Sequence, residues 1–505
     1  MIKLIYRIES DYMSKKRMLI VTSVTLSVVT ISLGIVKLYQ TYALSNYIGT
    51  VTDTGIDVYI NDDSYASIPA NGSSNVYYML TNTNPGTVKY GVAYQTTSGV
   101  TVKVYDTSED PATGTIEEND KKYIKLHLEN KNSTNKTIEL STVLGYENGG
   151  DLVVPSGVTL VTDTYTPPPT AAEYITKLYT TASKTTVTNN SITYNTAPSV
   201  SLMNDRLGGT TTDLDGGNIR YYGASPNNYI YFNCSDYSNQ TSSTCETWRI
   251  IGVFDGKLKL IRGSQIGTYS WDNKDTSTGA ESNFGKNDWT TARLMKLLNP
   301  SDYYTTDSND NNLGQGLYYN SASGKCYSGQ NNATVDCNFT STGIKNDITR
   351  NMIAETTYNL GGWNSNTVYP NLMYEKERGT TVYTGRPTTP WTGKIALAYT
   401  SDYGYAADLN QCKDKTLYDY NNSTCTSNNW MKAIITNNGS NSGWLLTPYC
   451  STSSNVWYVY RVGYVYFNYT VYSAFGAVPV LSLSSELGIE SGGDGSSSNP
   501  YKLSA

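Results

Sequence analysis

Residues 48–165 alternate between apolar and polar side chains over short runs that are separated by turn-forming residues. The runs are rich in Val, Ile, Leu and Tyr and lie at 76–80, 88–94, 100–105 and 123–128. Partial period-two patterning of this kind predicts half-buried strands. Asn-Pro-Gly and Ser-Gly segments between the runs supply turns. The pattern therefore predicts an all-β, immunoglobulin-like sandwich over residues 46–165.

The pattern changes after the sandwich. Three consecutive prolines at 167–169 predict a stiff hinge within a Pro/Thr-rich linker, residues 166–200. A short helix at 171–182 is expected inside this linker, because Tyr174, Ile175 and Leu178 fall on one helical face. Residues 201–490 mix strand-like and helix-like patterns and predict an α+β head, which a Gly/Ser-rich tail at 491–505 follows.

Two elements of the head are well specified by local signals. Residues 248–261 predict a β-hairpin that turns at Asp255-Gly256, since Asp-Gly suits a tight two-residue turn. Residues 288–300 predict a helix, because apolar residues recur at three- and four-residue spacing. Asp288 is the candidate N-cap of this helix and Pro300 its stop signal.

An apolar segment near the N-terminus sets the expected compartment. Residues 18–36 form a run of 19 residues without a charge, long enough to span a hydrocarbon core of roughly 30 Å as a helix. Basic residues precede this run, and Lys37 alone follows it closely. The charge bias predicts a single-pass anchor within residues 1–45, with the N-terminus inside and the bulk of the chain extracellular. A cleavable signal peptide, cut near Ala43-Leu44-Ser45, is the alternative.

Composition narrows the function classes. The chain has 505 residues, a net charge of −6, 46 tyrosines and one histidine, and no basic stripe lies outside the N-terminus. Nucleic-acid binding is therefore not expected. Catalysis by a Ser-His-Asp or Cys-His arrangement would have to use His127, which lies in a strand-like stretch. We expect no enzyme activity, metal site or cofactor, although an enzyme that uses carboxylates alone stays an alternative.

The spacing of the cysteines is consistent with an exported chain that contains disulfides. Six of the seven fall into local pairs with 10, 10 and 12 residues between their members, and Cys450 is left over. Loops of this size can close as disulfides, each stabilising the fold by roughly 2–3 kcal/mol. Buried free thiols are the alternative. The expected pairs are Cys234 with Cys245, Cys326 with Cys337, and Cys412 with Cys425.

Nine aromatic residues crowd into residues 457–475 and mark the candidate binding site. A hairpin about residues 461–463 would place Trp457, Val459, Val465 and Phe467 on one face, which we interpret as core. Tyrosine offers a large, stiff, amphipathic contact surface, and Asn and Arg add adaptable hydrogen bonds. Ordinary half-buried strand tyrosines are the alternative. The predicted ligand-binding residues are Tyr458, Tyr460, Arg461, Tyr464, Tyr466, Asn468, Tyr469 and Tyr472.

Five short motifs of the head occur in an order that resembles a known group of proteins. They are IRYYG at 219–223, WRIIG at 248–252, NDW at 287–289, WLLTP at 444–448 and GAVPVL at 476–481. This set resembles an uncharacterised family of extracellular domains from Gram-positive surface proteins, over about residues 200–490. The resemblance implies a C-type-lectin-like fold, shared with formylglycine-generating-type domains and with the variable proteins of diversity-generating retroelements. Val478 stands where such domains usually have arginine, and no reactive cysteine pair matches the formylglycine chemistry.

Together these features predict a membrane-anchored adhesin or receptor. The sandwich would be its stalk, and the aromatic patch near the C-terminus would bind a protein or glycan on another cell or surface. The resemblance further implies that the patch is a retroelement-diversified segment. A structural subunit of a cell-surface or pilus-like assembly is one alternative, and a carboxylate-based glycan hydrolase is another.

Overall fold

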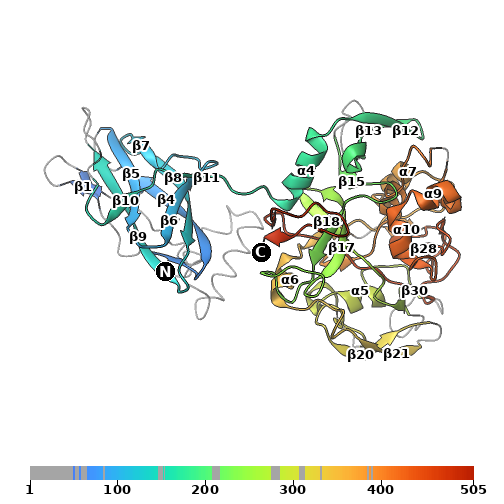
Figure 1. The fold of residues 1–505 in the computed structure, drawn as a ribbon. Coiled ribbons are helices and arrows are strands. Elements are labelled where there is room, and N and C mark those ends of the chain that lie inside the picture. Colours follow the sequence, from blue (N-terminus) through green and yellow to red (C-terminus); the bar gives the residue numbers. More distant parts are fainter. Residues whose placement is uncertain are drawn as a thin grey trace. The chain divides into compact units, whose positions relative to one another are not determined.

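The computed structural model describes most of the chain from residue 49 onward. The described residues are 49–51, 56–58, 65–82, 86–145, 152, 154–206, 216–273, 285–305, 313–329, 333–383, 386–387, 390–413 and 415–504. Within them the protein consists mainly of β-strands with a few short helices (Figure 1). It divides into two compact units, residues 1–167 and 168–505, at the predicted run of prolines.

The predicted membrane anchor at residues 18–36 lies outside the described residues. Among the helices that are described, none has both the length and the apolar character that crossing a membrane requires.

The first unit is built from two β-sheets. The first sheet has the order β10 (Val158–Leu160), β5 (Val88–Gln95), β9 (Lys136–Gly145), β3 (Tyr65–Ile68), with β7 (Thr113–Ile116) also paired to β5. The second has the order β11 (Thr164–Tyr165), β6 (Val100–Tyr105), β8 (Lys121–Asn130), β4 (Gly72–Thr81). Two short strands, β1 (Gly49–Val51) and β2 (Ile56–Val58), pair with each other.

Both sheets contribute to one hydrophobic core, so this unit is a β-sandwich. Ile68 and Val92 from the first sheet and Ile124 and Leu126 from the second are fully buried in the same cluster. The predicted runs become β4, β5, β6 and β8, which confirms the all-β character of this part of the chain. The immunoglobulin-like topology stays a prediction.

A nine-stranded sheet forms the centre of the second unit. Its main path runs β12 (Thr185–Asn189), β13 (Ile192–Ala197), β14 (Leu202–Asn204), β15 (Ile219–Tyr221), β17 (Glu246–Phe254), β18 (Lys257–Arg262), β31 (Val480–Ser482), β26 (Ile395–Ala396). The ninth strand, β16 (Tyr229–Phe232), also pairs with β17. The predicted hairpin is confirmed as β17–β18, and its turn residues Asp255 and Gly256 have φ of 49° and 70°.

A second sheet of five strands carries the aromatic segment. Its order is β19 (Thr268–Ser270), β30 (Ala474–Gly476), β27 (Gly443–Pro448), β28 (Val456–Val459), β29 (Val465–Tyr466). The remaining strands pair two by two: β20 (Ser323–Tyr327) with β21 (Thr334–Asn338), β22 (Thr356–Tyr358) with β25 (Trp391–Gly393), β23 (Thr381–Tyr383) with β24 (Arg386–Pro387), and β32 (Gly488–Ile489) with β33 (Leu503–Ser504).

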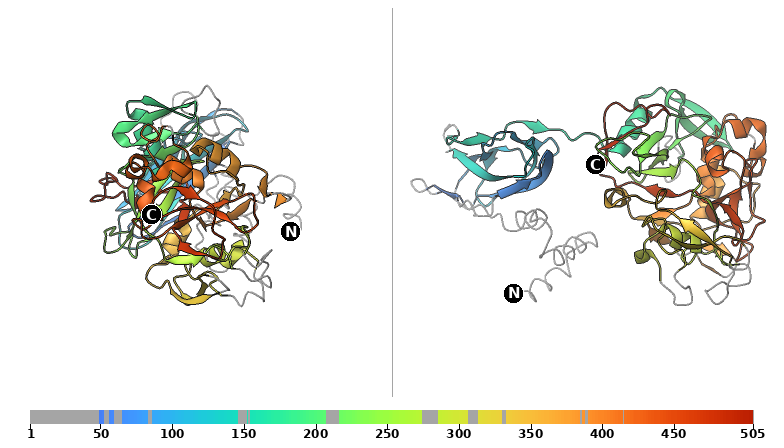
Figure 2. Two further views of the ribbon diagram at one scale, coloured as in Figure 1. Left: turned by 90° about the vertical axis from the view of Figure 1, so that its right-hand side faces the viewer. Right: turned by 60° about the horizontal axis from the view of Figure 1, so that its bottom comes forward.

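Short helices pack around these sheets. They are α4 (Ala171–Thr181), α5 (Arg293–Leu298), α6 (Asp347–Met352), α7 (Pro370–Glu377), α8 (Thr400–Tyr405), α9 (Ser423–Ser427) and α10 (Trp430–Ile435). Helices α9 and α10 lie beside β28, whereas the β20–β21 hairpin extends from another part of the unit (Figures 1 and 2).

The helix predicted at 288–300 is shorter than expected. It begins at Arg293, and Asp288 instead accepts hydrogen bonds from the backbone nitrogen and hydroxyl of Thr290 in a preceding turn. The backbone nitrogens of Arg293 and Leu294 bond to Asp272 and to the Trp271 carbonyl. Tertiary contacts, rather than a local cap, therefore fix where this helix begins, while its end before Pro300 agrees with the prediction.

The segments expected as linker and tail belong to the second unit. The predicted helix is present as α4, and Thr170 and Glu173 form its capping box. Beyond it, the Thr-rich stretch becomes β12 and β13, because β-branched residues suit strands. At the other end of the unit, β33 pairs with β32 and Leu503 is completely buried.

The three predicted disulfides are all present. Cys234 bonds to Cys245, Cys326 to Cys337 and Cys412 to Cys425, with Cα–Cα distances of 3.8, 5.9 and 5.3 Å. Cys450 lies outside these pairs and is half-buried. Stable disulfides form in oxidising compartments, so three of them indicate an extracellular or secreted protein.

Candidate functional site

The aromatic segment folds as the predicted hairpin. Strands β28 and β29 pair antiparallel, with Tyr458 opposite Tyr466 and Val459 opposite Val465. Gly463 closes the turn by donating its backbone N–H to the Tyr460 carbonyl at 2.7 Å. Its φ of 114° and the nearby Thr426 methyl, 2.8 Å from where a Cβ would lie, favour glycine here.

One face of the hairpin is core, as the sequence predicted, although Phe467 is only partly buried. Trp457, Val459 and Val465 are fully buried in a cluster that includes Trp430 and Met431 of α10. The Trp457 indole nitrogen donates to the Trp363 carbonyl at 3.2 Å. This face therefore fixes the hairpin to the rest of the unit.

The opposite face is only partly open, and Tyr458 is a correction to the prediction. Its side chain is 1% exposed and contacts Trp444 and Phe475 at ring distances of 6.2 and 5.0 Å. The second sheet continues past β28 through β27 to β30, so neighbouring strands cover the ring of Tyr458. This residue is a core residue and not a ligand contact.

Tyr458 nevertheless holds a neighbouring exposed residue, Asn468, in place. Its hydroxyl donates to the Asn468 side-chain oxygen at 2.5 Å, and Asn455 donates to the Phe467 carbonyl at 2.9 Å. Burial, followed by the neighbouring phenols, raises the pKa of Tyr458, so its hydroxyl remains a donor at neutral pH. These bonds hold the 467–469 segment on the hairpin.

Most of the other predicted contact residues reach the surface. Arg461 and Asn468 are exposed, Tyr469 is 44% exposed, and Tyr460 and Tyr464 are half-buried. Tyr466 and Tyr472 are also half-buried. Tyr472 lies toward β19, where its carbonyl accepts a hydrogen bond from Ser270 at 2.8 Å.

Tyr418, which the sequence analysis did not single out, joins this group. It lies in a short 3₁₀ turn, residues 417–421, and is 44% exposed. Its ring centroid is 5.4 Å from that of Tyr464 and 5.7 Å from that of Tyr466. The disulfide between Cys412 and Cys425 closes the loop that carries it. The available sequence signal was a tyrosine pair, Tyr-Asp-Tyr, inside a predicted disulfide loop.

Tyr418, Tyr460, Tyr464 and Tyr466 form one continuous group of rings, and Tyr469 joins it through the buried ring of Tyr458. We call this group, with the exposed side chains of Arg461 and Asn468, the aromatic surface. Tyr460 and Tyr464 lie 5.0 Å apart, and Tyr464 and Tyr466 lie 5.7 Å apart in an edge-to-face arrangement. Burial, then the neighbouring phenols, raises the pKa of Tyr464, so its hydroxyl also stays protonated at neutral pH. The aromatic surface consists of Tyr418, Tyr460, Arg461, Tyr464, Tyr466, Asn468 and Tyr469.

A buried charged network is the strongest alternative centre for chemistry. Arg220 contacts Asp205 and Asp402, and Lys259 contacts Asp402 as well. Glu377 accepts hydrogen bonds from Ser401 and Thr447 close by.

Two carboxyl groups of this region, those of Glu377 and Asp402, have pKa values that shift in opposite directions. Burial raises the pKa of Glu377. Burial also acts to raise the pKa of Asp402, but Lys259 and Arg220 outweigh it and lower that pKa below its ordinary value. Opposite shifts are typical of acid–base pairs. Here both side chains are at most 2% exposed, so we interpret the network as a structural element of the core.

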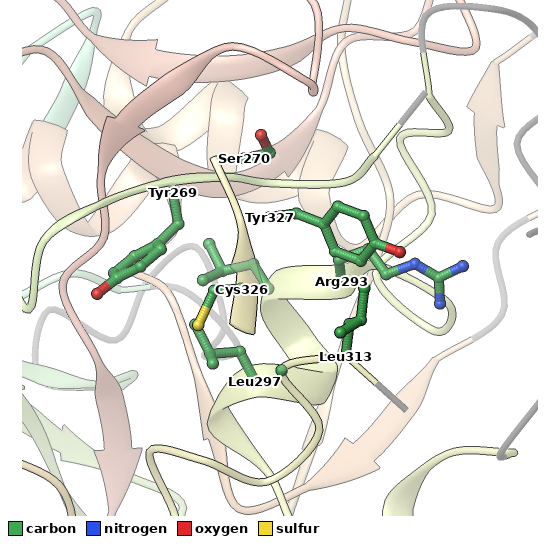
Figure 3. Close-up of a pocket in the computed structure, with 9 residues that line it drawn as sticks. Tyr269, Ser270, Arg293, Leu297, Leu313, Cys326 and Tyr327 are labelled. Carbon is green, nitrogen blue, oxygen red and sulfur yellow. The ribbon is translucent and has the colours of Figure 1, made fainter. Parts of the chain in front are cut away.

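A small cavity lies beside α5 (Figure 3). Arg293 and Leu297 reach it from α5, Cys326 and Tyr327 from β20, and Tyr269 from β19. Its volume is about 10 Å³, about enough for a single water molecule. Among the described residues, no group of three or more His, Cys, Asp or Glu side chains could hold a metal ion.

Comparison with known proteins gives no relative: no family model matches this chain, and neither a curated protein nor a solved structure is similar to it.

Proposed function

We propose that this chain is an exported binding protein whose aromatic surface contacts a protein or glycan on another cell or surface. The clustering of exposed and half-buried tyrosines from two separate segments carries this proposal. Tyr418 lies within 6 Å of Tyr464 and Tyr466, although about 46 residues separate them along the chain. Rigid aromatic side chains that remain open to water are the usual anchors of recognition surfaces.

Parts of the aromatic surface are also held in place without a ligand. Tyr458 fixes Asn468 from below, and the Cys412–Cys425 disulfide closes the loop of Tyr418. A preorganised contact surface loses little conformational entropy on binding. Arg461 and Asn468 add exposed hydrogen-bonding groups at its edge.

The remaining parts of the proposal concern anchoring and origin. Residues 18–36 anchor the chain with its N-terminus inside, and the sandwich acts as a stalk for a C-type-lectin-like head. The aromatic hairpin is a retroelement-diversified segment. A near-copy of its gene segment that differs chiefly at adenines, beside a reverse transcriptase gene, supports diversification; absence of such a copy from the genome counts against it.

The proposed site is tested by probing a glycan and protein array with the purified full chain. Replacing Tyr418, Tyr464 and Tyr469 together by alanine is expected to weaken binding at least about tenfold. A matched control replaces Tyr65 and Tyr77, which are 41% and 37% exposed in the sandwich. Equal binding by both variants rejects the site. Ordered oligomers of the chain without ligand would instead favour a structural subunit.

A further inference from the structure

A cleft on the second unit contains a buried arginine that forms no ion pair with any carboxylate of the described residues. The cleft has a volume of about 420 Å³, within the range of small-molecule sites. Strands β16, β17 and β18 and helix α10 contribute to it. It is lined by Tyr229, Glu246, Thr247, Arg249, Arg262 and Ser264, with Gly263 and Ile434.

Arg249 is held rigidly at this cleft. Its Nε donates to the Asn228 side-chain oxygen at 2.5 Å and its Nη2 donates to the Pro226 carbonyl at 3.2 Å. The guanidinium carbon lies 3.6 Å from the ring centre of Tyr229 and 4.9 Å from that of Trp430. Rings on a guanidinium stabilise its charge only partly.

The charge of Arg249 is otherwise uncompensated. The residue is 7% exposed, and burial lowers its pKa to about 10, so it remains a cation at neutral pH. Its Nη1 donates no hydrogen bond to the described residues and is not sealed from solvent. A desolvated cation without a counter-ion is costly, and a bound anion would relieve that cost.

The other charges of the cleft cancel each other. Arg262 forms two hydrogen bonds to Glu246, at 3.0 and 3.2 Å, and the Trp248 indole also donates to Glu246 at 3.0 Å. Arg262 additionally donates to the Ser264 hydroxyl at 2.9 Å. The cleft therefore keeps one net positive charge, from Arg249.

We propose that this cleft binds the carboxylate of an acidic saccharide, with Arg249 as its anchor. Thr247, Ser264 and Tyr229 offer hydroxyl groups that suit a hydroxyl-rich ligand, and Ile434 is the sole large aliphatic side chain of the lining. The lining therefore offers no apolar pocket for a side chain of a bound peptide. Arg249 alone does not match a polyphosphate such as nucleic acid, which is bound by a stripe of several basic residues. This site is separate from the aromatic surface and does not depend on it.

The test is calorimetric titration of the full chain with a galacturonic acid trimer, its methyl ester, an acidic peptide, acetate and sulfate. Binding of the trimer that weakens with added salt, with no binding of the ester, is the expected result. Equal binding of trimer and ester overturns the proposal, as does binding of acetate, sulfate or the peptide as tight as that of the trimer. No binding of the trimer overturns it too.

Two exposed substitutions test the residue assignment without disturbing the buried arginine. Thr247 lies in the cleft with its side chain exposed. Thr247→Glu places a carboxylate inside the cleft and is expected to bind the trimer at least tenfold more weakly than Thr247→Gln, which has the same size and shape but no charge. Equal affinities of the two variants reject Arg249 as the anchor. Arg249→Gln is expected to abolish binding, and the Tyr418, Tyr464 and Tyr469 variant to leave it unchanged.

Discussion

Replacing Cys412 and Cys425 by alanine opens the loop that carries Tyr418, so it tests both the stability of the unit and the aromatic surface. Both sulfurs are completely buried, and the disulfide closes a loop with a sequence separation of 13. In the chain-entropy model, a loop of this size stabilises the fold by about 3 kcal/mol. For a unit of roughly 340 residues, this corresponds to a melting temperature about 4 °C lower.

The Cys326–Cys337 disulfide provides a matched control. Its sequence separation is 11, so the same model gives a loss equal to within about 0.2 kcal/mol. It joins β20 to β21, which contact β19 through a hydrogen bond from Ser328 to Thr268. Strand β19 is the edge of the second sheet opposite β29, so this disulfide lies away from the aromatic surface.

The two double variants should therefore melt alike but bind differently. Differential scanning calorimetry measures the melting temperatures, and biolayer interferometry measures affinity for a ligand found on the array. Opening the Tyr418 loop is expected to weaken binding at least about fivefold, because the ligand must then order that loop. Unchanged affinity after this substitution, or an equal loss in both variants, would refute the reasoning.

Three further predictions concern single residues. Burial raises the pKa of Asp272 to about 6, above its ordinary 3.8, so the folded protein holds a proton there more tightly than the unfolded chain does. Stability from this group consequently falls as pH rises from about 4 to about 6, and Asp272→Asn should flatten the melting-temperature profile over that interval; an unchanged slope contradicts this. Gly463→Ala should cost about 1–3 kcal/mol because of its positive φ, measured by urea unfolding. Val462→Ala, at its exposed neighbour, should change stability by less than about 0.5 kcal/mol, so equal losses would exclude the strain argument. Leu503→Ala should cost about 2–5 kcal/mol in the same assay, whereas no loss would mean that β33 contributes nothing to the core.

The sequence predicted correctly those elements that depend only on residues close together in the chain. Asp255 and Gly256 form the expected turn because the two-residue Asp-Gly turn is encoded by those residues alone. The cysteine pairs were equally readable, since short separations favour closure. The core face of the aromatic hairpin followed from alternation about Gly463.

Features that depend on distant segments could not be predicted in this way. Asp288 does not cap α5, because the first N–H groups of this helix donate to the Asp272 side chain and to the Trp271 carbonyl. Alternation placed Tyr458 on an outward face, but it cannot reveal that neighbouring strands of the same sheet cover that ring. Tyr418 joins the aromatic surface through tertiary packing that no local pattern encodes.

The two ends of the second unit meet in space. The Ala171 backbone nitrogen donates to the Leu487 carbonyl at 2.6 Å, and Thr170 forms a β-bridge with Gly488. The Gln240 side-chain amide donates to the Leu503 carbonyl, and its side-chain oxygen accepts from the Leu503 backbone nitrogen. A domain with adjoining ends can be transferred between proteins as a cassette without stretching either junction, and it tolerates circular permutation. A force that pulls on the proline run would therefore act first on the backbone contacts of Thr170 and Ala171 with residues 487 and 488.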